Sequence, residues 1–503
     1  MDFKKIIFKK ELVILFLLVI VGSFLRLQGV LTNSFAFTYD VGRDMLALQN
    51  IVVNHDLMFI GATTGIPGVF YGPWWYYMLV PFFIIFRGDP AGIALIMAIV
   101  GVASIIVSYI LGKKIDGIFL GLGLAAFVSV SPVLVSLSVQ IWNPNIAPLF
   151  VMLTLYCLYK IYKFEKKDLR YFFFLGILLA LNIDIEILWG ILFTIGTILS
   201  LFFLIYKKIK IKQIFSFALG MILIASPRIF FEIKHGFQMS KSLITFITSK
   251  NTIEDPITFT QLVENRVNSF VDMYASSLTF NNQILAWVFI VFTVISAILF
   301  YKRSSEIFKK FMITLFTILI VFFIGTISFG RALWPHYLVG LPVIYILLFT
   351  LALFMIPKQE KYQYLIILAV SLLFIINFDP IRQLKSFMSP QFIGNASVYR
   401  NQLAVVDYVY KEANGKDFKF VAYTPPVFDY TYRYLFMWYG EKKYKYLPTE
   451  ETKDATYSFF IIEPDPGYED RPKWWLRDRE KNGKIIKSYT LPSGVVIQTR
   501  IEQ

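Results

Sequence analysis

"ELVILFLLVIVGSFLRLQGVLTNSFAFTYDVGRDMLALQNIV", residues 11–52, joins two segments of different character. The first, near residues 11–28, is long and apolar enough to be a membrane helix. The second holds Asp40, Arg43 and Asp44, and continues with apolar residues at the spacing of one helical face. The stretch therefore predicts a membrane helix followed, in the first loop, by a short helix that carries two carboxylates.

The composition of the whole chain also indicates a membrane protein. Of the 503 residues, 57% are hydrophobic and 18% are aromatic, and a water-soluble protein of this length would carry more charge. The formal net charge of +15 fits cytoplasmic loops that face anionic membrane lipids, and no nucleic-acid partner is expected. The single cysteine, Cys157, excludes an intramolecular disulfide. The basic start lacks a cleavage site and is interpreted as a retained signal anchor.

Eleven segments are interpreted as membrane helices. They lie near residues 11–28, 90–112, 117–134, 145–162, 171–184, 186–206, 212–230, 283–301, 308–328, 337–356 and 362–379. Lysine and arginine gather in alternate connections, which predicts a plasma-membrane protein with a cytoplasmic N-terminus and an external C-terminal part. Residues 72–86 are too short to span and contain a proline, so a helix in the outer interface is expected there.

Two domains follow from this topology. Residues 1–379 are predicted to form the transmembrane domain, with a first external loop at 29–89. Residues 380–503 are polar and contain one amphipathic helix and several strand patterns, so a small external domain is predicted. The fold class expected is thus an α-helical polytopic membrane protein of about eleven transmembrane helices, with interfacial helices in the first external loop and a C-terminal α/β domain.

The spacing of the first-loop charges points to acid–base chemistry. Asp40, Arg43 and Asp44 stand at i, i+3 and i+4, so one helical face carries two carboxylates with a guanidinium between them. Arg43 is expected to favour the ionised form of Asp40, and an ionised carboxylate can accept a proton from an alcohol. The same residues also suit the solvated first turn of an interfacial helix. Both interpretations stay open on this stretch alone.

Other polar residues gather at the predicted outer ends of the membrane helices. Asp184 and Glu186 must face a protein cavity or the outer water, because a charge that faces lipid is costly. Basic groups suited to phosphate oxygens are Arg228, Lys234, Arg331 and His336. Further residues expected to line a cavity are Glu232, His235, Asn143, Trp74 and Tyr76. Each cluster alone fits an interface anchor or polar turn equally well, and Asn143 also fits a helix cap.

No metal ligand is assigned from the sequence. No two histidines stand at i, i+4, and the acidic residues are not spaced as ligands. The cofactor prediction is therefore none, with a divalent cation (Mg²⁺ or Mn²⁺) between Asp40 and a carboxylate of another loop left open. The chain also lacks a Walker or dinucleotide motif, which argues against a cytosolic nucleotide-sugar donor.

Four segments, taken in order, resemble the C-type membrane glycosyltransferases (the GT-C fold). They are "YDVGRDMLALQNI", "IGATTGIPGVFYGPWWYYMLVPF", "SVQIWNPNIAPLF" and "FEIKHGF". The resemblance covers roughly residues 10–350. It is strongest to the prokaryotic branch that includes the protein O-mannosyltransferases and the aminoarabinose transferase of lipid A.

The resemblance implies transfer of a sugar from a polyprenyl-phosphate donor to a hydroxyl of a lipid, glycan or protein acceptor at the outer membrane face. Asp40 would be the general base, with Arg43 beside it and Asp44 as a second candidate. The donor phosphate would be bound by Arg331, His336, Arg228 and Lys234. A single displacement would invert the anomeric configuration. The chain departs from relatives at Val41, where they often have glutamate. It also departs in the second external loop, where some relatives have a carboxylate and this chain offers Asn143 and Asn145.

Two other functions are considered. A ligase or polymerase that uses a polyprenyl-diphosphate glycan would need more basic groups or a metal ion. A lipid-linked sugar transporter or flippase would place its polar residues near the middle of the membrane, whereas here they lie at the predicted outer ends of the helices.

Overall fold

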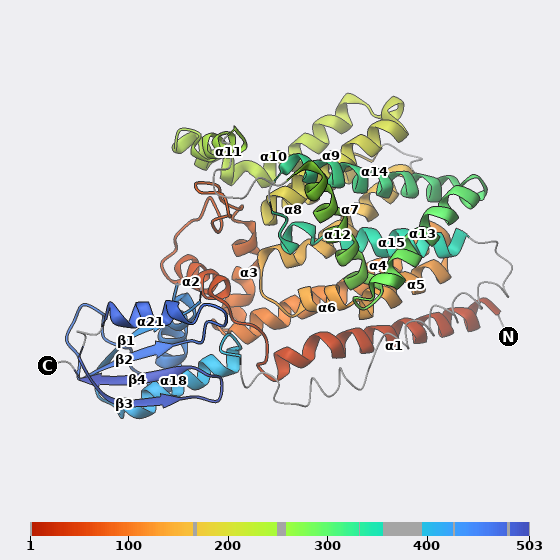
Figure 1. Ribbon diagram of the computed structural model, residues 1–503. Coiled ribbons are helices and arrows are strands. Elements are labelled where there is room, and N and C mark those ends of the chain that lie inside the picture. The colour runs from red at the N-terminus through yellow and green to blue at the C-terminus, as the bar shows by residue number, and fades with distance from the viewer. Residues whose placement is uncertain are drawn as a thin grey trace.

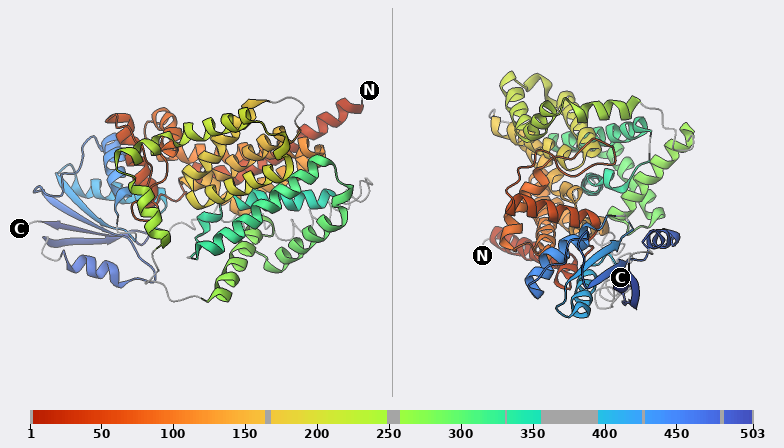
Figure 2. Two further views of the ribbon diagram at one scale, coloured as in Figure 1. Left: turned by 90° about the horizontal axis from the view of Figure 1, so that it is seen from above. Right: turned by 90° about the vertical axis from the view of Figure 1, so that its left-hand side faces the viewer.

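The structure is a computed structural model, and it describes residues 3–163, 168–248, 258–330, 332–355, 395–425, 428–479 and 483–501. A bundle of helices makes up most of the molecule, and a four-stranded sheet lies at one end of it (Figure 1). Seen from above, most bundle helices run in roughly one direction, and the N-terminus lies at the end opposite the sheet (Figure 2). The start of α1 and the C-terminal sheet therefore lie at opposite ends of the bundle.

The helices of the bundle and the first loop occupy the following ranges. They are α1 (Phe3–Leu31), α2 (Tyr39–Val53), α3 (Trp74–Ile85), α4 (Pro90–Asp116), α5 (Ile118–Val130), α6 (Pro132–Ser138), η1 (Asn143–Ile146), α7 (Ala147–Tyr162), α8 (Leu169–Ile185), α9 (Ile187–Ile205), η2 (Tyr206–Lys208), α10 (Ile211–Lys234), α11 (Gln238–Thr248), α12 (Phe259–Leu278), α13 (Gln283–Phe300), η3 (Tyr301–Arg303), α14 (Glu306–Phe329), η4 (Pro335–Leu338) and α15 (Leu341–Met355).

Seven helical stretches of the described residues are long and apolar enough to cross a membrane: α1, α4, η1 with α7, α9 with η2, α10, α13 and α14. The predicted spans near 171–184 and 337–356 correspond to the shorter helices α8 and α15. The predicted span at 362–379 lies outside the described residues. The protein is a multi-pass membrane protein, and the count of eleven spans stays a prediction.

The span predicted near 117–134 corresponds to two helices, α5 and α6, that together are long and apolar enough to cross a membrane. α5 and α6 meet at an angle of 63°, with Pro132 as the first residue of α6. Proline lacks an N–H and clashes with the preceding turn, so the helix breaks there. The buried Arg26 of α1 donates to the carbonyl oxygens of Val128 (2.9 Å) and Ser129 (2.7 Å) at the break. Such internal donors are needed where no water reaches the backbone.

The connection between the predicted spans 212–230 and 283–301 contains the helices α11 and α12. α12 packs against α13, α14 and α15, with Val271, Tyr274 and Leu278 buried in the main core. Its buried Arg266 donates to the carbonyl oxygen of Thr326 in α14 over 3.1 Å. The polar residues of α12 conceal its bundle position in the sequence.

The C-terminal part folds as the small α/β domain that the sequence predicts. Its elements are α18 (Tyr399–Ala413), β1 (Phe418–Tyr423), α19 (Tyr430–Leu435), η5 (Phe436–Gly440), α20 (Glu441–Tyr444), β2 (Tyr457–Ile462), α21 (Asp470–Arg477), β3 (Lys484–Thr490) and β4 (Val496–Ile501). The strand order is β1-β2-β4-β3, with β1 and β2 parallel and the other pairs antiparallel. This mixed sheet has a helix on each face.

Side chains of β2 alternate between the two faces, as a strand requires. Phe459 and Ile461 belong to the core that includes α18. Phe460 points to the other face, where its ring lies 5.9 Å from that of Trp475 in α21. The predicted amphipathic helix and strands are therefore packed together as one layered unit.

The C-terminal domain and the first loop share one hydrophobic core. Phe37 and Met45 of the first loop are fully buried in the same cluster as Tyr432 and Phe436 of the C-terminal domain. The helices α2 and α19 approach closely at Gly42, where an added Cβ would lie 2.5 Å from the backbone nitrogen of Thr431. The glycine of the "DVGR" segment thus allows the C-terminal domain to dock on the helix that carries Asp40.

Candidate active site

The three first-loop charges lie together, as their helical spacing predicts. Arg43 donates to Oδ1 of Asp40 over 2.6 Å, and to Oδ1 of Asp44 over 2.8 and 2.9 Å. The side chain of Asp40 is 20% exposed, whereas that of Asp44 is 1% exposed. Two carboxylates therefore share one guanidinium, and only Asp40 is accessible to a substrate.

Asp44 is occupied by hydrogen bonds to the neighbouring helix. Its Oδ2 accepts a bond from Nε1 of Trp75 over 2.9 Å, and its Oδ1 accepts one from the hydroxyl of Tyr76 over 3.2 Å. Asp44 thereby holds α3 against α2. Tyr76, which the sequence places on a cavity, is instead a buried partner of Asp44.

The surroundings of Asp40 favour a basic carboxylate. Burial raises the pKa of Asp40 above its usual value, while Arg43 opposes the rise and the neighbouring Asp44 adds to it. The effect expected of Arg43 is present but smaller than the effect of burial. A raised pKa moves a carboxylate towards the range in which it works best as a general base.

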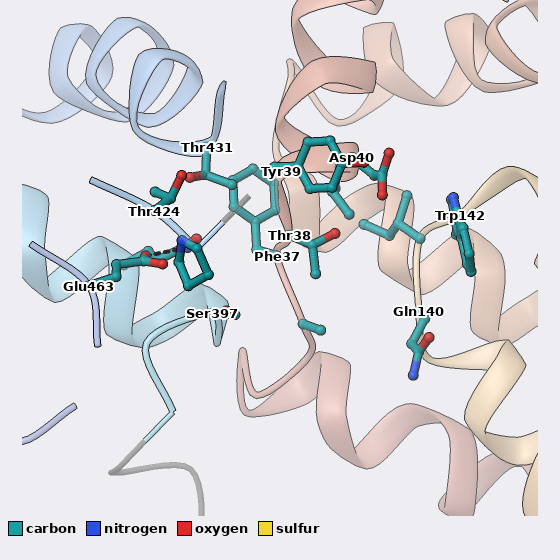
Figure 3. A pocket seen from close by; sticks show the side chains of 15 residues that line it. Phe37, Thr38, Tyr39, Asp40, Gln140, Trp142, Ser397, Thr424, Thr431 and Glu463 are labelled. Carbon is teal, nitrogen blue, oxygen red and sulfur yellow. Dashed lines mark hydrogen bonds between the residues drawn. The ribbon is translucent and has the colours of Figure 1, made fainter. Parts of the chain in front are cut away.

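Asp40 borders a cavity of about 360 Å³ between the first loop and the C-terminal domain (Figure 3). The first loop and the connection before η1 line it with residues 36–41 and 140–142. The C-terminal domain lines it with Ser397, Gln402, Thr424, Pro425, Thr431 and Glu463. In Figure 3, Asp40 and Trp142 lie towards one end, and Glu463 and Thr424 lie towards the other.

His336 contacts the ring of Trp142 at the edge of this cavity. The two rings are 5.0 Å apart between centroids and meet edge to face, and Trp142 lines the cavity. Burial lowers the pKa of His336 to about 4, so its imidazole is neutral at neutral pH and can still donate one hydrogen bond. Arg331, on the same connection between α14 and α15, lies outside the described residues.

Asp184 and Glu186 lie at the junction of α8 and α9, where they hold the end of the first loop. Oδ1 of Asp184 is 3.1 Å from Nη2 of Arg228, and its Oδ2 accepts a bond from the backbone N–H of Trp74 over 3.2 Å. Glu186 accepts a bond from the hydroxyl of Tyr71 over 2.9 Å. These two carboxylates are buried and paired within the protein.

Close packing also fixes the end of the first loop to the α8–α9 junction. A Cβ added to Gly72 would lie 1.5 Å from Oδ1 of Asp184. Trp74 donates through Nε1 to the carbonyl oxygen of Ile224 in α10 over 2.7 Å. Asn143 donates to the carbonyl oxygen of Ile185 over 2.6 Å, which ties η1 to the same junction.

The remaining residues of the α10 end take part in local structure. Glu232 accepts bonds from the backbone N–H groups of Met239 (2.7 Å) and Ser240 (3.0 Å), at the start of α11. His235 is exposed and stacks on Phe231, with 4.1 Å between ring centroids. Lys234 is exposed at the last position of α10. Within the described ranges, the cavity beside Asp40 is lined by none of the residues that the sequence places at the α8–α9 and α10 ends.

Comparisons with known proteins agree with the predicted fold. A model of the dolichyl-phosphate-mannose-protein mannosyltransferase family matches residues 71–231, and no curated protein is similar to the chain in sequence. ArnT from Cupriavidus metallidurans, in its apo state, is similar in structure, with a TM-score of 0.56, 10% identity and 97% of each chain covered. The chain has the GT-C fold. The fold class and the resemblance predicted from the sequence are thereby confirmed.

Two further solved structures are similar. ArnT from Cupriavidus metallidurans bound to undecaprenyl phosphate matches with a TM-score of 0.56, 11% identity and 97% of each chain covered. The apo oligosaccharyltransferase of Archaeoglobus fulgidus has a TM-score of 0.48 and 13% identity, over 84% of this chain. The chain spans 63% of the length of that oligosaccharyltransferase. The mannosyltransferase description of the matching family model agrees with the enzyme class predicted from the sequence.

Sequence reasoning missed the part of the cavity beside Asp40 that the C-terminal domain lines. Thr424 directly follows β1 and Glu463 directly follows β2, and these two strands are parallel. Ligands commonly bind beyond the carboxyl ends of parallel strands. The strand patterns were visible in the sequence, but their parallel pairing was not.

Arg43 lies between the two first-loop carboxylates, where a cation bound to both of them would have to lie. Among the described residues, no group of three or more His, Cys, Asp and Glu side chains is placed to hold a metal ion. Asp40 and Asp44 both bind Arg43, and Asp44 also binds Trp75. A cation would have to displace this guanidinium to reach both carboxylates.

Proposed function

We propose that the protein is a membrane glycosyltransferase that moves a sugar from a polyprenyl-phosphate donor to an acceptor hydroxyl, with Asp40 as the general base. The observation that carries this proposal is the difference between the two first-loop carboxylates. Asp44 is sealed by Arg43, Trp75 and Tyr76, while Asp40 faces a cavity beside the end of the helical bundle.

The proposed reaction is a single displacement. The acceptor oxygen attacks the anomeric carbon while Asp40 takes its proton. The bond between the anomeric carbon and the phosphate oxygen breaks, and the electron pair leaves with the polyprenyl phosphate. Because the acceptor attacks opposite the leaving group, the anomeric configuration inverts. Arg43 fixes the carboxylate of Asp40 through the 2.6 Å bond to Oδ1.

We assign the donor phosphate to the connection between α14 and α15. Arg228 is already paired with Asp184, and Lys234 is exposed at the end of α10. His336 lies against Trp142 at the Asp40 cavity and has one N–H to donate. Arg331, five residues earlier in the sequence, would supply the positive charge that a neutral imidazole lacks.

An apolar groove among α12, α13, α14 and α15 suits the polyprenyl chain. It has a volume of about 500 Å³, and its lining includes Phe270, Trp287, Phe323 and Tyr345. The last lining residue on α14 is Ile324, and the first on α15 is Tyr345. The groove therefore flanks the connection between these two helices, which carries His336. A lipid chain in this groove would deliver its phosphate towards the Asp40 cavity.

The proposed setting is the outer face of the plasma membrane, with a cytoplasmic N-terminus and the C-terminal domain outside. The polyprenyl tail explains why the site lies beside a membrane bundle, because the tail cannot leave the bilayer. The acceptor is a hydroxyl of a lipid, a glycan or a protein.

The test uses the purified protein in lipid nanodiscs with radiolabelled polyprenyl-monophosphate and polyprenyl-diphosphate sugars, and a membrane extract as acceptor. We expect transfer from a monophosphate donor, release of polyprenyl phosphate and a product of inverted configuration by NMR. Release of polyprenyl diphosphate, a retained configuration, or no transfer from any monophosphate donor would contradict the proposal.

A further inference from the structure

The end of the cavity farther from Asp40 is formed where β1 and β2 stop. Thr424 follows β1, Glu463 follows β2, and the register pairs Tyr423 with Ile462 at the carboxyl ends of these parallel strands. Gln402 of α18 and Thr431 of α19 complete this polar wall. The wall therefore comes entirely from the C-terminal domain, and Asp40 comes from the first loop.

Two side chains of the wall have polar atoms without partners. Gln402 and Thr431 are each 2% exposed, and neither Oε1 of Gln402 nor Oγ1 of Thr431 has a hydrogen-bond partner within the protein. Buried polar atoms are nearly always hydrogen-bonded, and leaving one unpaired is costly. Both residues line the cavity, so a ligand there can supply the missing bonds.

Glu463 is held rigidly beside them. It is 2% exposed, and its Oε1 accepts bonds from the hydroxyl of Tyr432 over 2.7 Å and from Nε2 of Gln402 over 3.3 Å. Burial raises the pKa of Glu463, which disfavours the charged form that a cationic ligand would need. The carboxyl group and the amide oxygen of Gln402 are hydrogen-bond acceptors, so the matching ligand presents several neutral donors.

We propose that this end of the cavity is an acceptor subsite that binds a saccharide unit through its hydroxyl groups. The inference rests on the proposed glycosyltransferase function and names the acceptor class. A sugar ring offers several hydroxyls in a small volume, whereas a peptide offers about one N–H per residue. Tyr39 lies between the two ends of the cavity (Figure 3) and is partly exposed, so its ring can pack against the C–H face of a sugar.

The experiment compares cavity variants with matched controls in the full chain. Thr431→Val and Glu463→Gln change the proposed subsite. Thr499→Val is the control for Thr431→Val, because Thr499 is also buried with an unpartnered hydroxyl but lies on β4 away from the cavity lining. Asp465→Asn is the control for Glu463→Gln, because Asp465 is a buried carboxylate that accepts a bond from the Tyr423 hydroxyl over 2.6 Å.

The first measurement is binding of methyl hexosides, methyl hexosaminides and disaccharides to the protein in nanodiscs, by saturation-transfer NMR. We expect binding to wild type, about a tenfold weaker affinity in each cavity variant, and unchanged affinity in both controls. Binding of polyprenyl phosphate should be the same in all five proteins. No saccharide binding to wild type, equal losses in variants and controls, or binding only of Ser/Thr peptides would overturn the subsite.

A second measurement separates this inference from the proposed function. If saccharides bind as expected but no polyprenyl-phosphate sugar is transferred, the result supports the saccharide subsite and contradicts the proposed reaction. If transfer occurs and the KM for a saccharide acceptor is unchanged in Thr431→Val and Glu463→Gln, the result supports the proposed reaction and contradicts the subsite.

Discussion

Two places in this molecule pair a carboxylate with an arginine beside the end of a membrane bundle, and their surroundings differ. At the first loop, Arg43 binds Asp40 and Asp44, and Asp40 keeps 20% of its side-chain surface exposed beside a cavity. At the α8–α9 junction, Arg228 lies beside Asp184, which is fully buried and also accepts a backbone N–H. The same residue types thus form an exposed carboxylate beside a cavity in one place and a buried structural contact in the other.

The difference lies in what packs against each carboxylate. Gly72 and Trp74 cover Asp184 from the first loop, so the charge is used to fix that loop. Asp40 stands at the second position of α2, and its neighbour across the cavity is a different domain. A charge at the edge of a membrane protein therefore indicates chemistry only when a cavity reaches it.

The largest expected contrast is in transfer activity. Asp40→Asn keeps the shape of the side chain and removes the proposed base, so transfer should fall by about 10²–10⁴-fold, the usual contribution of a general base. Asp184→Asn should retain transfer in the fraction that folds. Initial rates with a saturating donor, normalised to folded protein, measure both. Equal losses in the two variants would break the distinction between site and anchor.

The largest change in stability is expected at the α8–α9 junction, where Asp184 contacts Arg228. Gly72→Ala places a Cβ on the Asp184 carboxylate and should separate it from Arg228, at a cost of about 3–5 kcal/mol for disrupting a buried ion pair. Gly65→Ala is the matched control, because a Cβ at Gly65 meets nothing within 4 Å. Thermal unfolding in one detergent compares them. A Gly72→Ala protein as stable as the control would show that the junction is loosely packed.

The pH dependence sharpens the role of Asp40. Burial raises the pKa of Asp40, and only the ionised form accepts a proton, so kcat/KM should fall as the pH drops through that raised pKa. Because the folded pKa is above the unfolded one, ionised Asp40 costs stability at neutral pH. Asp40→Asn should therefore raise the unfolding temperature at pH 7 and abolish the acid limb of the residual activity. An unchanged acid limb would assign the titration to another group.

The smallest effect is expected at the end of α10. Lys234 is exposed, so Lys234→Ala should change the free energy of unfolding by less than about 0.5 kcal/mol. Its affinity for polyprenyl phosphate should equal that of wild type in a fluorescence titration. A clear loss of affinity would indicate that Lys234 binds the donor phosphate, and it would contradict the assignment of that phosphate to the α14–α15 connection.

Local patterns in the sequence predicted much of the fold. Periodicity and turn residues set the first membrane helix and the short helix with Asp40. They also set the amphipathic helix and the strands of the C-terminal domain. The spacing of Asp40, Arg43 and Asp44 also fixed their mutual contacts. These features depend on neighbours within one or two helical turns.

Features set by long-range packing were not predictable. Arg26 is part of a membrane helix, and nothing near it in the sequence indicates that it caps the broken end of α5. Glu463 follows an ordinary strand pattern, and only the parallel pairing of β1 with β2 brings it to the cavity. Asp184 and Asp40 look equivalent in sequence because the contact of Gly72 with Asp184 joins residues more than a hundred positions apart.

The most direct test of Asp40 as the base is chemical rescue. Asp40→Ala should be inactive in single-turnover transfer from the bound donor, and sodium formate should restore part of the rate, because the small carboxylate can enter the 360 Å³ cavity and accept the proton. Chloride at equal ionic strength should have no effect. Formate that fails to rescue Asp40→Ala, in a protein that still binds donor and acceptor normally, would contradict a proton-accepting role for Asp40.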